Sequence, residues 1–262
     1  MTDPHYDVRG GGPVLLVIPG GAGHPMGLDG MTEVLAERFT VVTYDPLGLA
    51  HGRLGLPVVE QRVQEWSEGA CRVLDTVPGG EESAYVLGFS SGGIAALDLL
   101  ARHPERVRHL VAHEPPVVGV LPDGARQQAR FREVYDTYRA AGLRAAGARL
   151  AAVLEEREPE ADQEPRPVSR AEESSSPLAL FLAHVLRPFS SYVPELDAPA
   201  ARLTLAAGAD SRGQLLYRTA TFLAERTGAG FAEFPGGHLG AAEHPRAFAD
   251  RLLAALDLSG RR

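Results

Sequence analysis

The strongest constraint on the fold is an alternation between short apolar segments and segments with helical spacing. Residues 14–21 (VLLVIPGG) and 39–45 (FTVVTYD) are apolar and end in turn residues, which is typical of strands buried on both faces of a parallel sheet. Residues 28–39, between them, have the spacing of an amphipathic helix. The same order recurs over residues 63–114 and returns over residues 201–258. The alternation predicts an α/β fold with a doubly wound, mostly parallel sheet.

One long segment interrupts this alternation. Between Pro115 and about Leu196 the pattern changes to two or three predicted helices. Residues 157–175, in the middle of the segment, carry charges and prolines with almost no apolar residues, which predicts a solvated or disordered loop. We therefore predict a core formed by residues 1–114 and 197–262. Residues 115–196 are predicted to form a helical cap inserted between two sheet strands.

Composition excludes several classes of partner. The 262 residues carry a formal net charge of −8, so no basic face is available for nucleic acid or an anionic membrane. Lysine is absent, which removes Schiff-base chemistry and a P-loop. No apolar run reaches the roughly 18 residues of a membrane span, and the single Cys71 fits a reducing compartment. With no secretory signal order in residues 1–12, we expect a cytoplasmic protein; its oligomeric state stays open.

The sequence LGFSSGGIAAL, residues 87–97, carries the main chemical motif. Gly88 to Gly92 match G-x-S-x-G, the nucleophile elbow in which a serine occupies a strained turn between a strand and a helix. The residues two positions before and after the serine must be small, and both are glycine. A plain strand-to-helix bend is the alternative explanation of these letters. The motif places the Ser90 hydroxyl at the carboxyl edge of the sheet, beside a helix N-terminus that favours negative charge.

With this motif and its companions in chain order, the protein resembles the α/β-hydrolase fold family over essentially its whole length. The resemblance implies that Ser90 is the nucleophile and that His238, which follows the last predicted strand, is the general base. His24, His51 and His113 also fall near predicted strand ends, but none has the position of the family's base.

The oxyanion hole and the acid are also inferred from the resemblance. VIPGGAGH matches the family's loop after an early strand, which implies oxyanion donors from the N–H groups of Gly21 and Ser91. Two carboxylates compete for the role of triad acid. Asp210 follows the penultimate strand, the commoner position, although it stands two residues after Gly208 instead of three. Glu114 follows the strand beside the nucleophile strand, where some relatives carry the acid. We favour Asp210 slightly and keep both.

These residues favour a serine hydrolase that cleaves an ester, lactone or thioester of a small hydrophobic substrate through an acyl-enzyme. C–C bond hydrolysis and cofactor-free perhydrolysis remain open, as does a non-hydrolytic protein of the same fold that binds a small ligand or steers a cyclisation. No ligand cluster or dinucleotide fingerprint indicates a metal or cofactor. The cap is predicted to supply an apolar substrate pocket. Candidate pocket residues are His24, Val117, Tyr135, Phe181 and Phe189.

Overall fold

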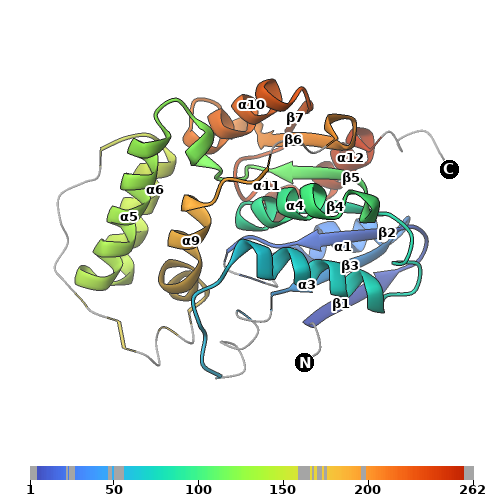
Figure 1. The fold of residues 1–262 in the computed structure, drawn as a ribbon, viewed down its shortest axis with the longest axis horizontal. Coiled ribbons are helices and arrows are strands. Elements are labelled where there is room, and N and C mark those ends of the chain that lie inside the picture. Colours follow the sequence, from blue (N-terminus) through green and yellow to red (C-terminus); the bar gives the residue numbers. More distant parts are fainter. Residues whose placement is uncertain are drawn as a thin grey trace.

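Within the residues that the computed structural model describes, seven strands form a sheet in the order β1-β3-β2-β4-β5-β6-β7 (Figure 1). Strands β2 to β7 pair in parallel and β1 pairs antiparallel with β3, which confirms the predicted doubly wound, mostly parallel sheet. The strands are β1 His5–Gly10, β2 Val14–Ile18, β3 Thr40–Asp45, β4 Ala84–Phe89, β5 Val107–His113, β6 Leu203–Gly208 and β7 Gly230–Phe234. The structure describes residues 5–21, 23, 27–46, 49, 56–158, 166, 168–169, 173, 176–195 and 199–256.

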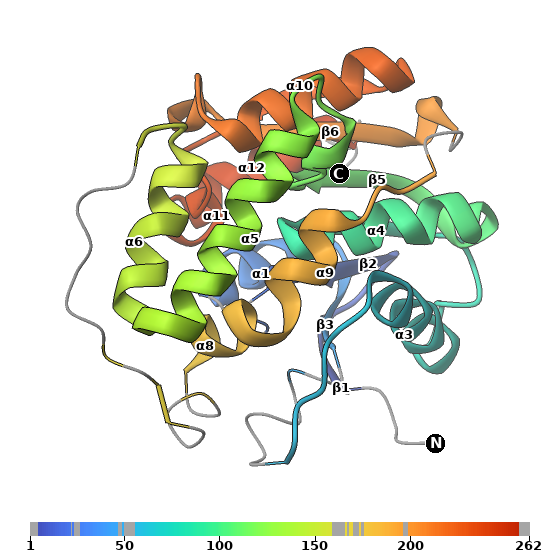
Figure 2. The ribbon, with the colours of Figure 1, turned by 60° about the vertical axis from the view of Figure 1, so that its left-hand side comes forward.

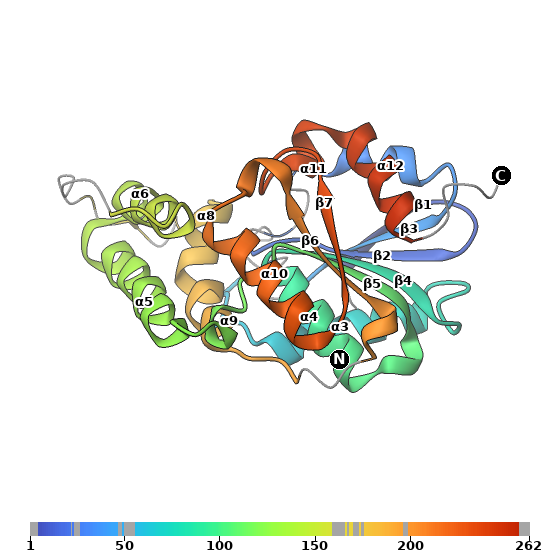
Figure 3. The same ribbon diagram turned by 90° about the horizontal axis from the view of Figure 1, so that it is seen from above.

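Helices cover both faces of the sheet because successive side chains of each strand point to opposite faces. On β2, Leu16 and Ile18 pack in one apolar cluster with α3, α4 and α10, whereas Leu15 and Val17 pack in another with α1 and α12. Figure 3 shows these two layers on either side of the sheet. The helices are α1 Asp29–Leu35, α3 Val63–Thr76, α4 Ser91–Arg102, α10 Leu215–Thr227, α11 Gly240–Glu243 and α12 Pro245–Ala255.

The sequence pattern did not reveal the first strand. Strand β1 lies at the edge of the sheet, and its residues are exposed or half-buried along most of its length. An edge strand that faces solvent carries no continuous apolar run, so its sequence HYDVRG resembles a polar N-terminal segment.

A group of helices lies between β5 and β6. These inserted helices are α5 Gly124–Ala141, α6 Leu143–Leu154, α8 Pro177–Leu180, the π-helical turn Phe181–Val185 and α9 Leu186–Ser191. Most of the polar stretch 157–175 lies outside the described residues. The division into a core and a separate cap of residues 115–196 stays a prediction. None of the described helices combines the length and the apolar character needed to cross a bilayer.

The direction of winding locates the site. The chain moves from β2 to β3 toward one edge of the sheet, and from β4 to β7 toward the other edge. In open α/β sheets ligands bind outside the carboxyl ends of the strands where this direction reverses. Ser90 directly follows β4, at this point. The inserted helices stand in front of the sheet in Figure 2, over the same end.

Candidate active site

Ser90 occupies a strained turn between β4 and α4. Its backbone has φ 50° and ψ −120°, and its N–H donates a hydrogen bond to the His113 carbonyl at 2.9 Å. Few residues other than glycine adopt a positive φ, and such strain persists only where the surroundings impose it. A Cβ on Gly92 would lie 2.2 Å from the Pro19 carbonyl oxygen, and one on Gly88 would lie 2.7 Å from the Gly92 carbonyl oxygen. The two glycines are therefore required by close packing around the serine.

His238 and Glu114 form a hydrogen-bonded pair beside this turn. The Nδ1 atom of His238 lies 2.6 Å from Oε2 of Glu114, and the Gly208 N–H donates to Oε1 at 3.0 Å. The Glu114 side chain is 1% exposed and that of His238 is 32% exposed, so the pair links the interior to the surface. Glu114 also has a positive φ, of 48°. The backbone strain at the end of β5 turns this carboxylate toward His238.

The surroundings keep Glu114 ionised. Burial alone would raise its pKa, but the hydrogen bond and charge of His238, with smaller contributions from His113 and the Ser211 hydroxyl, lower the pKa to about 2. A carboxylate that stays charged at neutral pH can hold Nδ1 of His238 in its protonated form, which leaves Nε2 free to accept a proton.

Asp210, which the sequence slightly favoured, does not occupy this position, and the choice of the triad acid stays a prediction. Its side chain is exposed, and its backbone N–H donates to the Gly236 carbonyl at 3.0 Å. The structure describes both residues and shows no hydrogen bond or ion pair between Asp210 and His238. The short turn after β6 brings Asp210 beside the loop that precedes His238 but directs its side chain to solvent. The roles of Ser90, His238 and Glu114 in catalysis stay predictions.

Ser90 and His238 line a cavity of about 150 Å³ beneath the inserted helices. No hydrogen bond joins these two described side chains, and contacts of this kind often tighten only when a substrate binds. Most of the wall is apolar. The other lining residues are Gly20, Gly21, Ser91, Pro116, Phe131, Leu150, Leu154, Phe181, Leu186, Phe189, Ser190 and Leu216.

Gly21 and Ser91, the residues predicted to form the oxyanion hole, both line this cavity. Ser91 is the first residue of α4, where backbone N–H groups have no partner within the helix. A Cβ on Gly21 would lie 2.2 Å from the Phe181 ring, so only glycine fits between that ring and the loop. The positions suit two backbone donors beside Ser90, and the oxyanion role stays a prediction.

The other predicted pocket residues divide into three groups. Phe181 and Phe189 line the cavity. Val117 does not; it is fully buried in the core cluster that contains α4 and β5. Tyr135 also lies elsewhere, because its ring packs under the Arg187 guanidinium at 4.9 Å. His24, like His51, lies outside the described residues. Helical spacing alone could not separate side chains that face the cavity from those that join the helices.

Sequence reasoning also missed residues that support the site. Leu150 and Leu154 lie one helical turn apart on α6 and line the cavity, but the same spacing is typical of any packed helix. Gly208 was noted only as the start of a turn, although its N–H holds Glu114. No local sequence signal reports such a contact, because 94 residues separate the two partners.

His113 lies behind the pair in an apolar environment. It is 1% exposed, and its ring contacts those of Phe89, Phe234 and Phe248 at centroid distances of 5.7, 5.9 and 5.3 Å. Neither ring nitrogen has a hydrogen-bond partner in the structure, which describes all of these residues. Burial lowers the pKa of His113 to about 4, so the ring is neutral at pH 7. In the described part of the chain, no group of three or more potential ligand side chains could hold a metal ion.

Comparisons with known proteins identify the family and the fold. A family model described as alpha/beta hydrolase fold matches residues 13–197. The chain is 31% identical over 258 residues to the "Uncharacterized hydrolase YraK" of Bacillus subtilis (strain 168), covering 95% of this chain and 90% of that protein.

Solved structures share the whole architecture at low identity. A hydrolase from Pseudomonas aeruginosa PA01 superposes with a TM-score of 0.64 at 20% identity, covering 96% of this chain and 93% of that one. A thermophilic esterase from Thermogutta terrifontis superposes with a TM-score of 0.67 at 15% identity, covering 97% and 93%. At these identities the likeness concerns the fold.

Proposed function

Because the chain belongs to the α/β-hydrolase fold family and is a hydrolase of that fold, we propose that it cleaves an ester, lactone or thioester of a small hydrophobic substrate through a Ser90 acyl-enzyme. One observation carries the proposal. The strained Ser90 turn and the imidazole of His238, held by the buried Glu114 carboxylate at 2.6 Å, face the same apolar cavity.

The reaction would begin with attack of the Ser90 hydroxyl on the substrate carbonyl. Nε2 of His238 accepts the hydroxyl proton, and Glu114 stabilises the imidazolium through Nδ1. The carbonyl oxygen gains negative charge and receives hydrogen bonds from the Gly21 and Ser91 N–H groups. His238 then returns the proton to the leaving oxygen or sulfur atom.

Water completes the cycle. His238 accepts a proton from a water molecule, whose oxygen attacks the acyl carbon, and the proton passes back to the Ser90 oxygen as the acid product leaves. Each step needs the same tautomer of His238. The fixed Glu114 carboxylate supplies this tautomer throughout.

The cavity suits an uncharged hydrophobic acyl or ring group. Its wall is formed mainly by aliphatic and aromatic side chains, and a cavity of about 150 Å³ with such a lining accommodates a molecule the size of benzene. A charged substituent would lose its hydration there without gaining a partner. We expect medium-sized uncharged p-nitrophenyl esters to have a higher kcat/KM than short charged ones.

Labelling with a fluorophosphonate tests the proposal without knowledge of the natural substrate. We expect one covalent adduct by intact-mass analysis and its location on Ser90 by peptide mapping. Ser90→Ala should prevent labelling and ester hydrolysis while thermal stability stays equal or rises, since the strained serine is not needed for folding. Ser91→Ala is the matched control and should still be labelled.

An adduct on Ser91, or no adduct on the folded protein, would refute the serine-hydrolase proposal and favour a ligand-binding protein of this fold. C–C bond hydrolysis and perhydrolysis would use the same serine and remain alternatives. They are separated from ester hydrolysis by assaying the unlabelled enzyme and its Ser90→Ala variant with a β-diketone, and with an ester plus hydrogen peroxide.

A further inference from the structure

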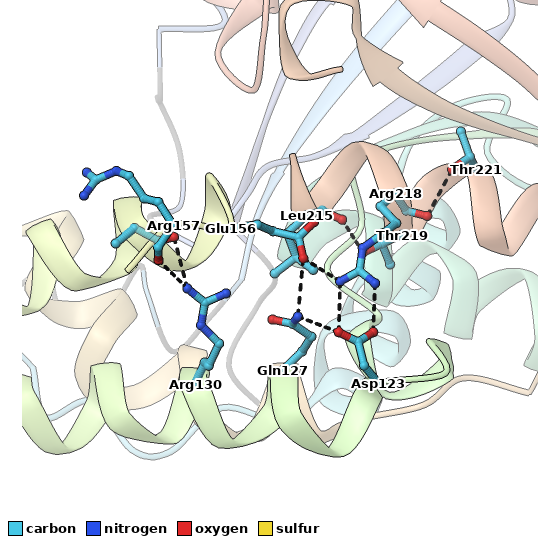
Figure 4. A network of polar contacts seen from close by, with 10 residues as sticks. Asp123, Gln127, Arg130, Glu156, Arg157, Leu215, Arg218, Thr219 and Thr221 are labelled. Carbon is cyan, nitrogen blue, oxygen red and sulfur yellow. Dashed lines mark hydrogen bonds and ion pairs between the residues drawn. The ribbon is translucent and has the colours of Figure 1, made fainter. Parts of the chain in front are cut away.

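A cluster of charged and polar side chains joins the inserted helices α5 and α6 to α10 of the core (Figure 4). Arg218 of α10 is at its centre and donates to both carboxylate oxygens of Asp123, at 2.8 and 3.2 Å. It also donates to Glu156, which follows α6, at 2.7 Å. Gln127 of α5 donates to Asp123 at 2.8 Å and to Glu156 at 3.4 Å. We call these four residues the Arg218 clasp.

The clasp connects the same three helices that form one wall of the cavity. Phe131 comes from α5, Leu150 and Leu154 come from α6, and Leu216 comes from α10. Gln127 and Phe131 are four residues apart and lie on the same face of α5. Any change in the separation of α6 and α10 would therefore move the clasp and the wall together.

The α9 residues that line the cavity are attached differently. Phe189 of α9 packs on Trp66 of α3 with ring centroids 4.6 Å apart. Close to it, the Tyr192 hydroxyl donates to Asp98 of α4, a carboxylate that is itself buried and also accepts from Ser67. Phe189, Trp66, Ser67 and Asp98 are buried, and Tyr192 is half-buried. The α9 side is thus tied to α3 and α4 of the core. Helices α5 and α6 share a buried apolar cluster with Leu215 of α10, and their polar connection to α10 runs through ion pairs whose side chains are about one third exposed.

The clasp also contains features that are unfavourable on their own. Glu156 has φ 54°, a left-handed conformation that costs free energy in a residue other than glycine. The Nε atom of Arg218 is buried, and the structure shows no hydrogen-bond partner for it among the residues described. Ion pairs whose side chains are about one third exposed contribute little net stability. The arrangement is thus better explained by the position it imposes on the helices than by the stability it adds.

We propose that Arg218 is a specificity-determining positioning residue, which holds the α5–α6 wall against α10 and limits the cavity to an acyl group about the size of a benzene ring. The substrate class follows from this limit. Short or branched hydrophobic acyl groups fit the clasped cavity, and a long unbranched chain requires the α5–α6 wall to move outward. The kinetic test of this inference rests on the proposed esterase activity, whereas the hydrogen-exchange test does not.

The kinetic test compares p-nitrophenyl butyrate with p-nitrophenyl octanoate. Arg218→Met keeps the aliphatic stem and removes the guanidinium, and it should raise the octanoate-to-butyrate ratio of kcat/KM about tenfold. The change should lie in a lower KM for octanoate, with kcat for butyrate unchanged within about twofold. Arg218→Lys retains a charge for one carboxylate and should restore part of the discrimination.

Arg130→Met is the matched control. Arg130 donates to the carbonyls of Arg157 at 2.6 Å and Ala152 at 3.3 Å, so it joins α5 to the end of α6 without reaching α10. Its loss should leave the octanoate-to-butyrate ratio within twofold of wild type. If Arg218→Met folds poorly, Asp123→Asn combined with Glu156→Gln removes the carboxylates instead and should raise the ratio similarly.

Hydrogen exchange measured by mass spectrometry gives a readout independent of activity. Arg218→Met should speed exchange in α6 at least threefold and leave α9 unchanged, whereas Arg130→Met should not change the protection of α10. If the wild-type protein hydrolyses neither ester but α6 exchanges faster in Arg218→Met than in wild type, the esterase proposal is refuted and the role of the Arg218 clasp is supported. An unchanged ester ratio in an active, folded Arg218→Met enzyme, or unchanged exchange in α6, would overturn the inference.

Discussion

The loops after β5 and β6 both bring a carboxylate to the carboxyl edge of the sheet, but they present it differently. Glu114, after β5, is buried, and its two oxygens accept from Gly208 and contact His238. Asp210, after β6, lies in a short 3-10 turn and is exposed. Its Cβ is 3.9 Å from where a Cβ on Gly237 would lie, so the residue is close to the His238 loop. Proximity to His238 is therefore common to both loops.

The difference shows that backbone conformation and burial select the partner of His238. The positive φ of Glu114 turns its side chain along the sheet edge, and backbone strain of this kind costs on the order of 1–3 kcal/mol. A buried carboxylate would add a larger cost if it lacked partners. The Gly208 N–H and His238 offset that cost, and together they fix the carboxylate in one position. Asp210 keeps its hydration and has no such constraint.

Removing the charge of Glu114 should have the largest effect. In Glu114→Gln the amide can present its NH₂ group to Nδ1 and stabilise the wrong tautomer, as well as lose the negative charge. We expect kcat/KM for p-nitrophenyl butyrate to fall by roughly 10³ to 10⁴, or about 4 to 5.5 kcal/mol of transition-state stabilisation. Steady-state kinetics at pH 7.5 on protein with an unchanged circular dichroism spectrum measures this. A loss below tenfold would remove Glu114 from the triad.

The free energy of unfolding should fall in acid because of two residues at the end of β5, His113 and Glu114. His113 has a folded-state pKa of about 4 against about 6.5 when unfolded, so the unfolded chain binds more protons in between. Its contribution to stability is complete above pH 6.5 and is lost as pH falls toward 4, by up to roughly 3 kcal/mol. The contribution of Glu114 to stability is lost at lower pH, between about 4.5 and 2, because its pKa is lowered in the folded protein.

His113→Leu should therefore flatten the decline in the free energy of unfolding between pH 6.5 and 4, because leucine is of similar size and removes both unpartnered nitrogens. Urea denaturation across this range measures the change. His109→Gln, on the same strand, controls for the loss of a histidine. The expectation fails if the His113→Leu and wild-type curves remain parallel from pH 6.5 to 4.

Gly208→Ala should test the contact between the two loops. A Cβ at this position would lie 2.5 Å from the Gly236 carbonyl oxygen and 2.6 Å from Cα of Gly237. The loop that carries His238 would have to move, and displacements of about 1 Å at a catalytic group cost roughly 10² in rate. We expect a 10- to 100-fold loss of kcat/KM.

Gly237→Ala provides the matched control for this substitution. The nearest atom to its added Cβ would be Oγ of Ser211 at 3.5 Å, an ordinary van der Waals distance. Its kcat/KM should stay within about threefold of wild type. Equal losses in the two variants would mean that general disturbance of the loop, rather than the Gly208 contact, limits activity.

Asp210→Asn should have the smallest effect. Substitution of exposed side chains away from buried networks usually changes stability by less than about 0.5 kcal/mol. Asp210 is exposed, and among the described residues it forms no hydrogen bond or ion pair with His238. We expect kcat/KM within about twofold of wild type, at least tenfold above Glu114→Gln. If Asp210→Asn loses as much activity as Glu114→Gln, the conclusion that only the β5 loop supplies the carboxylate partner of His238 is wrong.

Much of the fold could be predicted from local pattern. The apolar runs that became β2, β3 and β4 and the helical spacing of α3 and α4 are each encoded by neighbouring residues. The exception, β1, lies at a solvent-exposed edge, where pairing with β3 supplies the order that the side-chain pattern does not. The lining of the cavity was predicted only in part, because Phe181 and Tyr135 have the same local character and differ only in what they contact.

The sequence by itself determined the doubly wound sheet, the strained turn at Ser90 and the position of His238, because each depends on residues within a few positions of one another. Only the tertiary structure decided that Glu114 instead of Asp210 contacts His238, and that Arg218 joins α10 to Asp123 and Glu156. These contacts link residues 62 to 124 positions apart. Their geometry depends on how strand ends and inserted helices pack, which no local pattern of residues specifies.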